Sequence, residues 1–436
     1  MKKNITCQTL DNYGNGILKY ERLYLRYKDA LIGDVFECVI KNRKIEVIKR
    51  IKDSKDRTTP FCPYYHLCGG CQLQHMHYLK ELDYKKHVVK SHLKKVNLTP
   101  VINDTIKDED PYHYRTKLIT TYQPGHKHKL ISGLYEEESH RLVEVKDCPI
   151  QNKLGNRIIK TINNILIKHK IKAYDEDKQT GIIRHLLIRV GLHTNEVLVC
   201  FIIGSNVFPG INNVLKDLTK DPHIKSVYLN INQRKSSAIT SNRFKHLYGA
   251  KYIKDKLLGL TYLIGPDTFY QVNPTQAEKL YDVAIKGLEL TKTDTLLDCF
   301  SGIGTISLTA SKYVKEVIGV EYVKASTELA IRNAKLNQIT NATFITDDAT
   351  TFIHTFQKPF NKLIVDPPRS GLDKSFIEAI LLKKPQRISY VSCNPETLAR
   401  DLNILKTAYH IESVTPLDMF CHTYHIESVT LLTLKK

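Results

Sequence analysis

Two hydrophobic patterns divide the chain. Residues 1–55 alternate apolar and polar side chains between short turns, which predicts a small, OB-like β-barrel. Strand-like alternation broken by helical stretches follows over 112–265 and predicts α+β structure. From about residue 275, helical stretches alternate with fully apolar strands, as in a parallel α/β sheet. The predicted regions are a barrel at 1–55, a central α+β domain at 56–265 and an α/β domain at 266–436. A helical stretch at about 77–96 lies in the second region and is a candidate to pack on the third.

The charge is strongly positive and unevenly spread. The 65 Lys and Arg residues outnumber 45 acids, giving a net charge of +20. Residues 295–436 hold 16 basic and 14 acidic side chains, so nearly all of the excess precedes them. A basic front attached to a nearly neutral end predicts a part that binds a polyanion, such as RNA, joined to a part that does chemistry. The alternative is that the barrel has only a structural role and that the basic surface only keeps the protein soluble.

The composition argues against a membrane protein. The longest clean apolar run, residues 197–203, is far shorter than the ~20 residues of a membrane span. The first residues are polar, and no apolar segment typical of a signal peptide follows them. We therefore expect a soluble, cytoplasmic protein with no membrane partner.

Ten cysteines are present, and three of them form a cluster. Cys62, Cys68 and Cys71 have the spacing C-x5-C-x2-C, and Cys148 is the nearest later candidate. In a cytoplasmic chain such a cluster indicates metal binding or catalysis rather than disulfides. Four thiolates suit either an iron–sulfur cluster or structural zinc.

A glycine-containing turn is the main cofactor signal. The buried strand that ends near Asp298 leads through Gly302 and Gly304 into a helix. A second strand ends in Glu321, an acid placed to hold ribose hydroxyls, and a third ends near Asp348. The turn lacks the G-x-G-x-x-G pattern of dinucleotide sites. It resembles instead the S-adenosylmethionine site of class I methyltransferases.

Two further strand ends carry candidate chemistry. The fourth strand ends in a stiff Asp-Pro-Pro-Arg loop, residues 366–369, at the edge of the sheet where substrates bind. The alternative interpretation is a rigid turn. The fifth strand ends in Ser-Cys-Asn-Pro, which puts Cys393 at its tip, where a nucleophile is expected rather than a core residue. Because a free thiol has a pKa of ~8.5, its surroundings must activate it.

These motifs together resemble the bacterial RNA 5-methyluridine methyltransferases. The resemblance rests on the two loops just described, on residues 269–273 (FYQVN), on residues 425–427 (HIE) and on the cysteine cluster. It covers essentially the whole chain, and the barrel resembles a TRAM domain. The nearest likeness is to the TRAM- and iron–sulfur-containing 23S ribosomal RNA (uracil-5-)-methyltransferases, which implies a Rossmann-like class I methyltransferase domain.

The resemblance also implies roles for individual residues. Cys393 would be the nucleophile, Glu427 the general base, and Asp366 would act in catalysis and border the cofactor. The residues implied to bind S-adenosylmethionine are Gln271, Phe300, Thr305, Glu321, Asp348 and Asp366. The implied ligands of a [4Fe-4S] cluster are Cys62, Cys68, Cys71 and Cys148. The chain departs from many relatives by having Thr305 instead of asparagine and by lacking a proline in residues 420–425.

The resulting hypothesis is methylation of C5 of a uridine in 23S ribosomal RNA through a covalent cysteine–C6 adduct. Possession of both barrel and cysteine cluster favours large-subunit ribosomal RNA as the partner of a monomeric enzyme. The same chemistry on transfer RNA is the first alternative. A radical S-adenosylmethionine enzyme would need C-x3-C-x2-C, and a non-catalytic RNA-binding assembly factor would leave Cys393 and Glu427 without a purpose.

One repeat complicates the choice of general base. The heptapeptide Tyr-His-Ile-Glu-Ser-Val-Thr occurs at residues 409–415 and again at 424–430, so Glu412 and Glu427 have identical near neighbours. Both copies alternate like strands and predict an antiparallel pair that closes the sheet. Only the second copy follows residues 420–423, a loop that resembles the corresponding loop of the family, and this favours Glu427 as the base. The alternative is that both glutamates face solvent.

Overall fold

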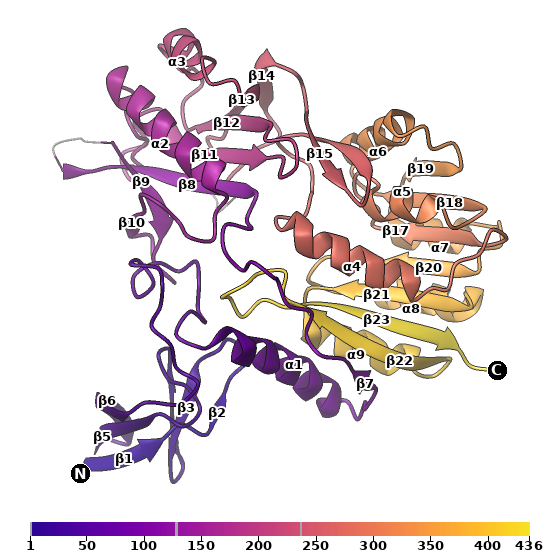
Figure 1. Ribbon diagram of the computed structural model, residues 1–436, viewed down its shortest axis with the longest axis horizontal. Coiled ribbons are helices and arrows are strands. Elements are labelled where there is room, and N and C mark those ends of the chain that lie inside the picture. Colours follow the sequence, from indigo (N-terminus) through magenta and orange to yellow (C-terminus); the bar gives the residue numbers. More distant parts are fainter. Residues whose placement is uncertain (1, 127–129, 236–237) are drawn as a thin grey trace.

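The computed structural model describes residues 2–126, 130–235 and 238–436. The α/β region, in orange and yellow, lies on one side of the molecule (Figure 1). The β-rich N-terminal region and the central sheet lie on the other side, one at each end. A yellow loop of the α/β region reaches back toward the purple segments between them. In the described part of the chain, no helix has the length and apolar character needed to cross a membrane.

The N-terminal region consists of two small antiparallel sheets around one core. Side chains of Ile5, Leu18, Phe36 and Cys38 are almost fully buried between them. The first sheet has the order β1 (Lys2–Thr6), β5 (Val35–Lys41), β6 (Lys44–Lys52). The second has the order β2 (Thr9–Leu10), β3 (Gly16–Tyr20), β4 (Leu23–Tyr27). The β-rich fold predicted from the alternating pattern is confirmed.

A long helix and a short strand connect this region to the α/β sheet. Helix α1 (Tyr78–Lys95) buries Val89 and Leu93 in the same core as Leu398 and Leu402. Strand β7 (Val101–Ile102) then pairs in parallel with β22 (Tyr409–Leu417) at the edge of the large sheet. Residues early in the chain thus become part of the α/β layer structure.

The central region is built on a mixed sheet whose middle strands are fully buried. Its strands, in spatial order, are β10 (Leu142–Glu144), β9 (Leu130–Tyr135), β8 (Lys117–Pro124), β11 (Ile183–Val190), β12 (Val197–Ile203), β13 (Ile224–Ile231) and β14 (Phe244–Gly249). Helices α2 (Lys153–Lys168) and α3 (Ile211–Leu218) pack their apolar faces on it. The hairpin of β15 (Ile253–Leu257) and β16 (Leu260–Ile264) leads on toward the α/β region.

The α/β region is a doubly wound sheet. Its order is β19 (Ala342–Thr346), β18 (Glu316–Glu321), β17 (Thr295–Cys299), β20 (Lys362–Val365), β21 (Arg387–Ser392), β23 (Glu427–Leu434), β22 and β7. Strands β17 to β21 are parallel, and β23 runs antiparallel between β21 and β22. This is the predicted Rossmann-like methyltransferase fold, and the order reverses beside β17, where ligands of such sheets bind.

Helices cover both faces of this sheet. One core contains residues of α1, α7 (Ala349–Thr355), α8 (Lys374–Lys383) and α9 (Pro395–Leu405). The core on the opposite face contains residues of α4 (Pro274–Lys286), α5 (Thr305–Ser311) and α6 (Lys324–Leu336). Because both faces are covered, the inner parallel strands are buried and mainly apolar, which is the pattern that identified them in the sequence.

The two copies of the heptapeptide adopt different structures. The first lies wholly within β22, whereas the second enters β23 only at Glu427. The predicted antiparallel pairing of β22 with β23 is confirmed. The prediction that both copies form strands throughout is wrong for residues 424–426, because these belong to the loop that leads into β23.

Candidate active site

The turn between β17 and α5 forms a cradle open to a ligand. Gly302 and Gly304 both have left-handed backbones, with φ of 55° and 84°. A Cβ on Gly302 would meet nothing within 4 Å, so this face of the turn is open. The carboxylate of Glu321, at the end of β18, accepts hydrogen bonds from the backbone N–H groups of Gly302 (3.0 Å) and Val323 (2.8 Å). The glycine turn and Glu321, which the sequence predicted as parts of one site, are therefore in direct contact.

Two buried polar atoms at this cradle have no hydrogen-bond partner among the residues that the structure describes. Asp298 Oδ1 and Ser301 Oγ are both buried without a hydrogen bond. Burial also raises the pKa of Asp298 to about 7, since its charged form is poorly solvated. Such groups fit a bound polar ligand, and the chemistry of the set suits the polar parts of a nucleoside.

Three of the other predicted cofactor residues, Phe300, Thr305 and Asp348, belong to segments that follow strands at this edge. Phe300 follows β17 with a left-handed backbone (φ 70°), and its ring packs against Phe376. Thr305 opens α5 and donates a hydrogen bond to Tyr281 (3.2 Å). Gln271 is buried. Asp348 is the exposed N-cap of α7, where it accepts from Thr351 N (2.9 Å).

Gly304 provides a test of this cradle that needs no ligand. A Cβ there would lie 2.8 Å from the Phe344 ring, on a backbone that side chains rarely adopt. We expect Gly304→Ala to lower the free energy of unfolding by about 2–4 kcal/mol, the sum of the backbone strain and the overpacking. Gly302→Ala has similar backbone strain but no clash, so it should unfold at a higher denaturant concentration than Gly304→Ala. Equal midpoints for the two variants would contradict the predicted clash.

Strand register brings Cys393 and Glu427 together. Ser392, the last residue of β21, pairs with Ser428 of the antiparallel strand β23. The next position along each strand toward this edge is Cys393 on one side and Glu427 on the other. Glu427 is buried, whereas Cys393 is half-buried. Two predicted residues 34 positions apart in the chain thus meet because neighbouring strands end at the same edge.

Asp366 completes a cluster of acidic groups around the thiol. It follows β20, which lies beside β21 in the sheet. Burial, together with the negative charges of Glu427 and Asp366, raises the pKa of Cys393 to about 11, and the positive charge of Arg369 opposes this rise. Burial also raises the pKa of Asp366 to about 7 and that of Glu427 well above its ordinary value. At neutral pH the thiol is therefore protonated until a positive charge or a change in solvation stabilises its thiolate.

Arg369 and His425 are residues whose roles sequence reasoning missed. The positive charge of Arg369 opposes the rise in the pKa of both Cys393 and Glu427. Its Nη2 also donates to His425 Nδ1 (3.2 Å). Because a guanidinium can only donate, this imidazole is neutral, in agreement with a pKa lowered to about 4 by burial and by Arg369. The Asp-Pro-Pro-Arg motif contained Arg369, but no local signal linked it to His425.

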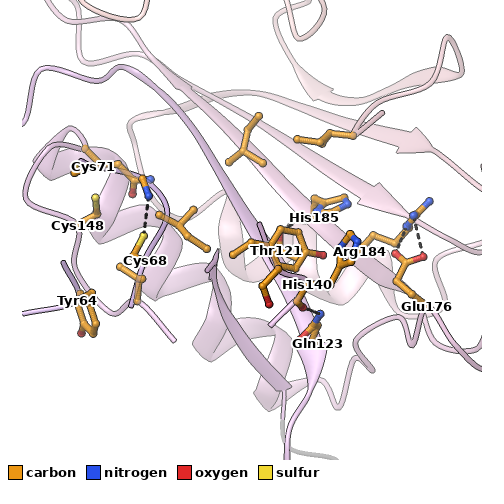
Figure 2. A pocket seen from close by; sticks show the side chains of 18 of the residues that line it. Tyr64, Cys68, Cys71, Thr121, Gln123, His140, Cys148, Glu176, Arg184 and His185 are labelled. Carbon is orange, nitrogen blue, oxygen red and sulfur yellow. Dashed lines mark hydrogen bonds and ion pairs between the residues drawn. The ribbon is translucent and has the colours of Figure 1, made fainter. Parts of the chain in front are cut away.

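A pocket of about 1620 Å³ lies next to this edge. The central sheet, the cysteine segment and the loop before β23 line it, and Phe420, Thr423 and His425 belong to its wall. Cys393 and Glu427 do not line it. Figure 2 shows the cysteines gathered at one end and polar side chains at the other. There His185 hydrogen-bonds Thr121 Oγ1 (3.1 Å), and Arg184 pairs with Glu176 (2.7 Å).

The four predicted metal ligands share one end of this pocket. Cys62, Cys68, Cys71 and Cys148 all line it, and each of them interacts electrostatically with the other three. Burial raises the pKa of Cys148 to about 11 and raises those of the other three thiols as well. Among the described residues, however, no three His, Cys, Asp or Glu side chains are arranged closely enough to hold a metal ion. The thiols are gathered but do not converge on one point.

Comparison with known proteins identifies the family. The sequence profile of the tRNA (Uracil-5-)-methyltransferase family matches residues 77–435. The chain belongs to this family. It is 37% identical to an uncharacterized RNA methyltransferase of Staphylococcus aureus (strain N315), over 99% of this chain and 98% of that protein. It is equally similar, at 37%, to one of Halalkalibacterium halodurans, over 99% and 96% of the two chains.

A solved structure extends the likeness to the whole fold. The Pyrococcus abyssi tRNA (uracil-54, C5)-methyltransferase, crystallised with S-adenosyl-L-homocysteine, matches with a TM-score of 0.79 and 27% identity. The match covers 99% of both chains. Together with the family match, it establishes this chain as an RNA methyltransferase with the predicted class I fold.

Proposed function

We propose that the protein transfers a methyl group from S-adenosylmethionine to C5 of a uridine in large-subunit ribosomal RNA through a covalent Cys393 adduct. The register that puts Cys393 opposite Glu427 carries this proposal. A nucleophile alone would suit many reactions. A thiol, a buried carboxyl and the glycine cradle at one sheet edge suit C5 methylation of a pyrimidine, which needs both addition and proton removal.

The chemistry explains the need for both residues. Uracil C5 is a poor nucleophile, but bonding of the Cys393 thiolate to C6 makes an enolate whose C5 is electron-rich. Bound S-adenosylmethionine would supply an electrophilic methyl group. Once C5 carries both methyl and hydrogen, Glu427 removes that proton, and the electron pair re-forms the C5–C6 double bond as the sulfur leaves C6. Asp366 borders both the thiol and the cofactor edge, where it would help orient the uracil.

The raised pKa values predict how the reaction rate depends on pH. The reaction needs Cys393 as thiolate and Glu427 as carboxylate, and both groups have raised pKa values in the free protein. Their reactive forms therefore become more abundant as pH rises. We expect the single-turnover rate of adduct formation to increase by up to about tenfold per pH unit between pH 6.5 and 8.5. A rate that is flat or falls over this range would contradict thiolate attack by Cys393.

We further propose a division of labour along the chain. Residues 1–55 and 56–265 would bind RNA, and residues 266–436 would bind cofactor and carry out the reaction. Extraction of the target uridine from its stack costs about a few kcal/mol, and contacts of the basic regions with RNA phosphates offset this. The cofactor contacts would come from Gln271, Phe300, Thr305, Glu321, Asp348 and Asp366.

Transfer RNA is the second candidate substrate. The Pyrococcus abyssi structure that matches 99% of this chain is that of a tRNA (uracil-54, C5)-methyltransferase. Because that match includes the N-terminal β-rich region, the barrel alone does not separate the two substrates. The gathered cysteines remain the feature that favours ribosomal RNA, through the resemblance to iron–sulfur ribosomal RNA enzymes.

Mass mapping of RNA tests the proposal. Ribosomal and transfer RNA from a strain with the gene and from a strain without it would be digested and analysed for 5-methyluridine. We expect the deletion to remove 5-methyluridine from large-subunit ribosomal RNA, and a plasmid copy to restore it. Loss confined to transfer RNA would overturn the substrate assignment. No change in either RNA would overturn the proposed activity.

We propose that Cys62, Cys68, Cys71 and Cys148 hold a [4Fe-4S] cluster. A single zinc ion would need its thiolates to converge at bonds of ~2.3 Å, and within the described ranges of the chain no such convergence is found. Four iron atoms keep their thiolates further apart, which suits four gathered but separate thiols. With all four positions bound to cysteine, such a cluster has no open iron, and its role would be structural.

Visible absorption tests the cluster. We expect anaerobically purified protein to show broad absorption in the visible range and iron with acid-labile sulfide. The variant Cys68→Ser should lose most of both, because one ligand of four is removed. Cys7→Ser, a buried cysteine of the N-terminal core, is the matched control and should keep both. A colourless preparation with one zinc per chain would contradict the iron–sulfur assignment.

A further inference from the structure

The loop that leads into β23 is held by groups outside the α/β region. This loop, residues 418–426 and here called the base loop, ends directly before Glu427. At its centre His422 is buried and has a left-handed backbone with φ of 66°. Non-glycine residues rarely adopt this conformation, so it persists only where surrounding contacts fix it.

A buried charged cluster fixes one side of the base loop. Lys85 of α1 lies 2.5 Å from Asp418 and 2.8 Å from Glu81, and all three side chains are fully buried. Lys85 Nζ also donates to the carbonyl of Phe420 (3.2 Å). Glu81 in turn accepts a hydrogen bond from His422 N (2.7 Å). Two side chains of α1 thus contact the base loop at three residues, Asp418, Phe420 and His422.

The cysteine segment fixes the other side. The backbone N–H groups of Gln72 and Leu73 both donate to the carbonyl of His422 at 3.0 Å. Tyr114 Oη donates to the carbonyl of Cys421 (3.1 Å). Since Gln72 directly follows Cys71, the base loop is bonded to the chain beside the proposed cluster.

The nucleophile does not depend on these contacts in the same way. Cys393 follows β21, which lies in the middle of the sheet, paired with β23 along its whole length and with β20 over residues 387–390. Asp366 follows β20, another inner strand. Glu427, by contrast, is the first residue of β23, so its backbone is continuous with the base loop. Loosening of the loop would displace the carboxyl more than the thiol.

We infer that Lys85 and Glu81 are positioning residues that hold Glu427 in place for removal of the C5 proton. The inference rests on the proposed function. Because Glu427 acts after methyl transfer, loss of this support should slow release of product and leave methyl transfer nearly unchanged. A cluster that merely stabilised the fold would affect both steps alike.

Two variants and a control test this inference. Lys85→Met keeps an unbranched chain but removes the buried positive charge that pairs with the carboxylates of Asp418 and Glu81. Glu81→Gln keeps the volume and an oxygen that can accept from His422 N, and is the milder change should Lys85→Met fold poorly. Lys86→Met is the matched control, because Lys86 is the next residue of α1 and its ion pair is with the exposed Asp104, outside the buried cluster. Melting temperature and S-adenosylhomocysteine affinity would verify that each variant is folded.

The measurement separates the two steps on the RNA fragment that mass mapping identifies. Fragment carrying 5-fluorouridine at the target has no C5 proton to remove, so its covalent adduct reports addition and methyl transfer alone. Ordinary fragment reports release of 5-methyluridine. We expect adduct formation within about twofold of wild type, but release slower by about 10- to 100-fold, for Lys85→Met and Glu81→Gln. Lys86→Met should match wild type in both.

Each other outcome has a defined meaning. Equal loss of both rates in a folded variant would show a structural role only and overturn the inference. Unchanged release in folded Lys85→Met, or in Glu81→Gln where Lys85→Met does not fold, would overturn it too. Failure of wild-type protein to form either adduct or 5-methyluridine would instead overturn the proposed function.

Discussion

Cys393→Ala should abolish methyl transfer while RNA still binds. Without the sulfur, C6 has no covalent partner and C5 never becomes electron-rich, so we expect single-turnover methylation to fall by at least about 10⁴-fold. Affinity for RNA should stay within about twofold of wild type, because phosphate contacts of the basic regions dominate binding. Labelled-methyl incorporation and filter binding, on the same RNA fragment, measure the two quantities.

The control for this variant is another buried thiol. Cys200 lies in β12 of the central sheet and is fully buried. Cys200→Ala should retain methylation, since Cys200 belongs to a different sheet from β21, the strand that precedes Cys393. Turnover of Cys393→Ala at the wild-type rate would refute the nucleophile assignment, whatever the control does.

The layers of the fold were predictable because each strand carries its own signal. The fourth strand was expected at residues 362–365 and is observed there. Its last three residues, LIV, are apolar and directly precede Asp-Pro-Pro-Arg, whose two prolines cannot continue a central strand. The helical stretch expected at 77–96 is observed as α1, from Tyr78 to Lys95. Periodicity over such lengths reports burial, and burial determines these elements.

Contacts between remote segments were not predictable in this way. Strand β7 has only two residues, too few for any pattern, and exists because β22 offers an unpaired edge. Lys85 is fully buried, although lysine is almost never buried without a partner. Its partner Asp418 lies 333 residues later, so the sequence around Lys85 holds no trace of the pair.

The residues of the candidate site likewise differ in how far the sequence alone could place them. Cys393, Asp366 and Glu321 each follow an apolar strand, and the rule that parallel strands end at one edge brings them together. The carboxyl of Glu427 could be assigned only through family resemblance, because Glu412 has the same seven-residue surroundings. In the structure the two differ completely: Glu412 is exposed and pairs with Arg387 (2.7 Å), whereas Glu427 is buried.

Glu427→Gln should trap the reaction after methyl transfer. Glutamine has the size of glutamate but cannot take up the C5 proton, so the methylated adduct has no route to elimination. We expect release of 5-methyluridine to slow by about 10²- to 10⁴-fold. Protein bonded to RNA should accumulate and carry the labelled methyl, visible as a shifted band on a denaturing gel. The double variant Cys393→Ala/Glu427→Gln should give no such band, which would show that the bond is to Cys393.

Glu412→Gln is the matched control that the repeat provides. The substitution is the same and so are the flanking residues, but Glu412 holds Arg387 and accepts from Thr433 on the exposed side of the β22–β23 pair. Its loss removes only a surface ion pair, which contributes about 0–1 kcal/mol. Turnover should therefore be nearly normal, with no shifted band. A trapped adduct in Glu412→Gln together with free turnover in Glu427→Gln would require the base to be reassigned to the first copy.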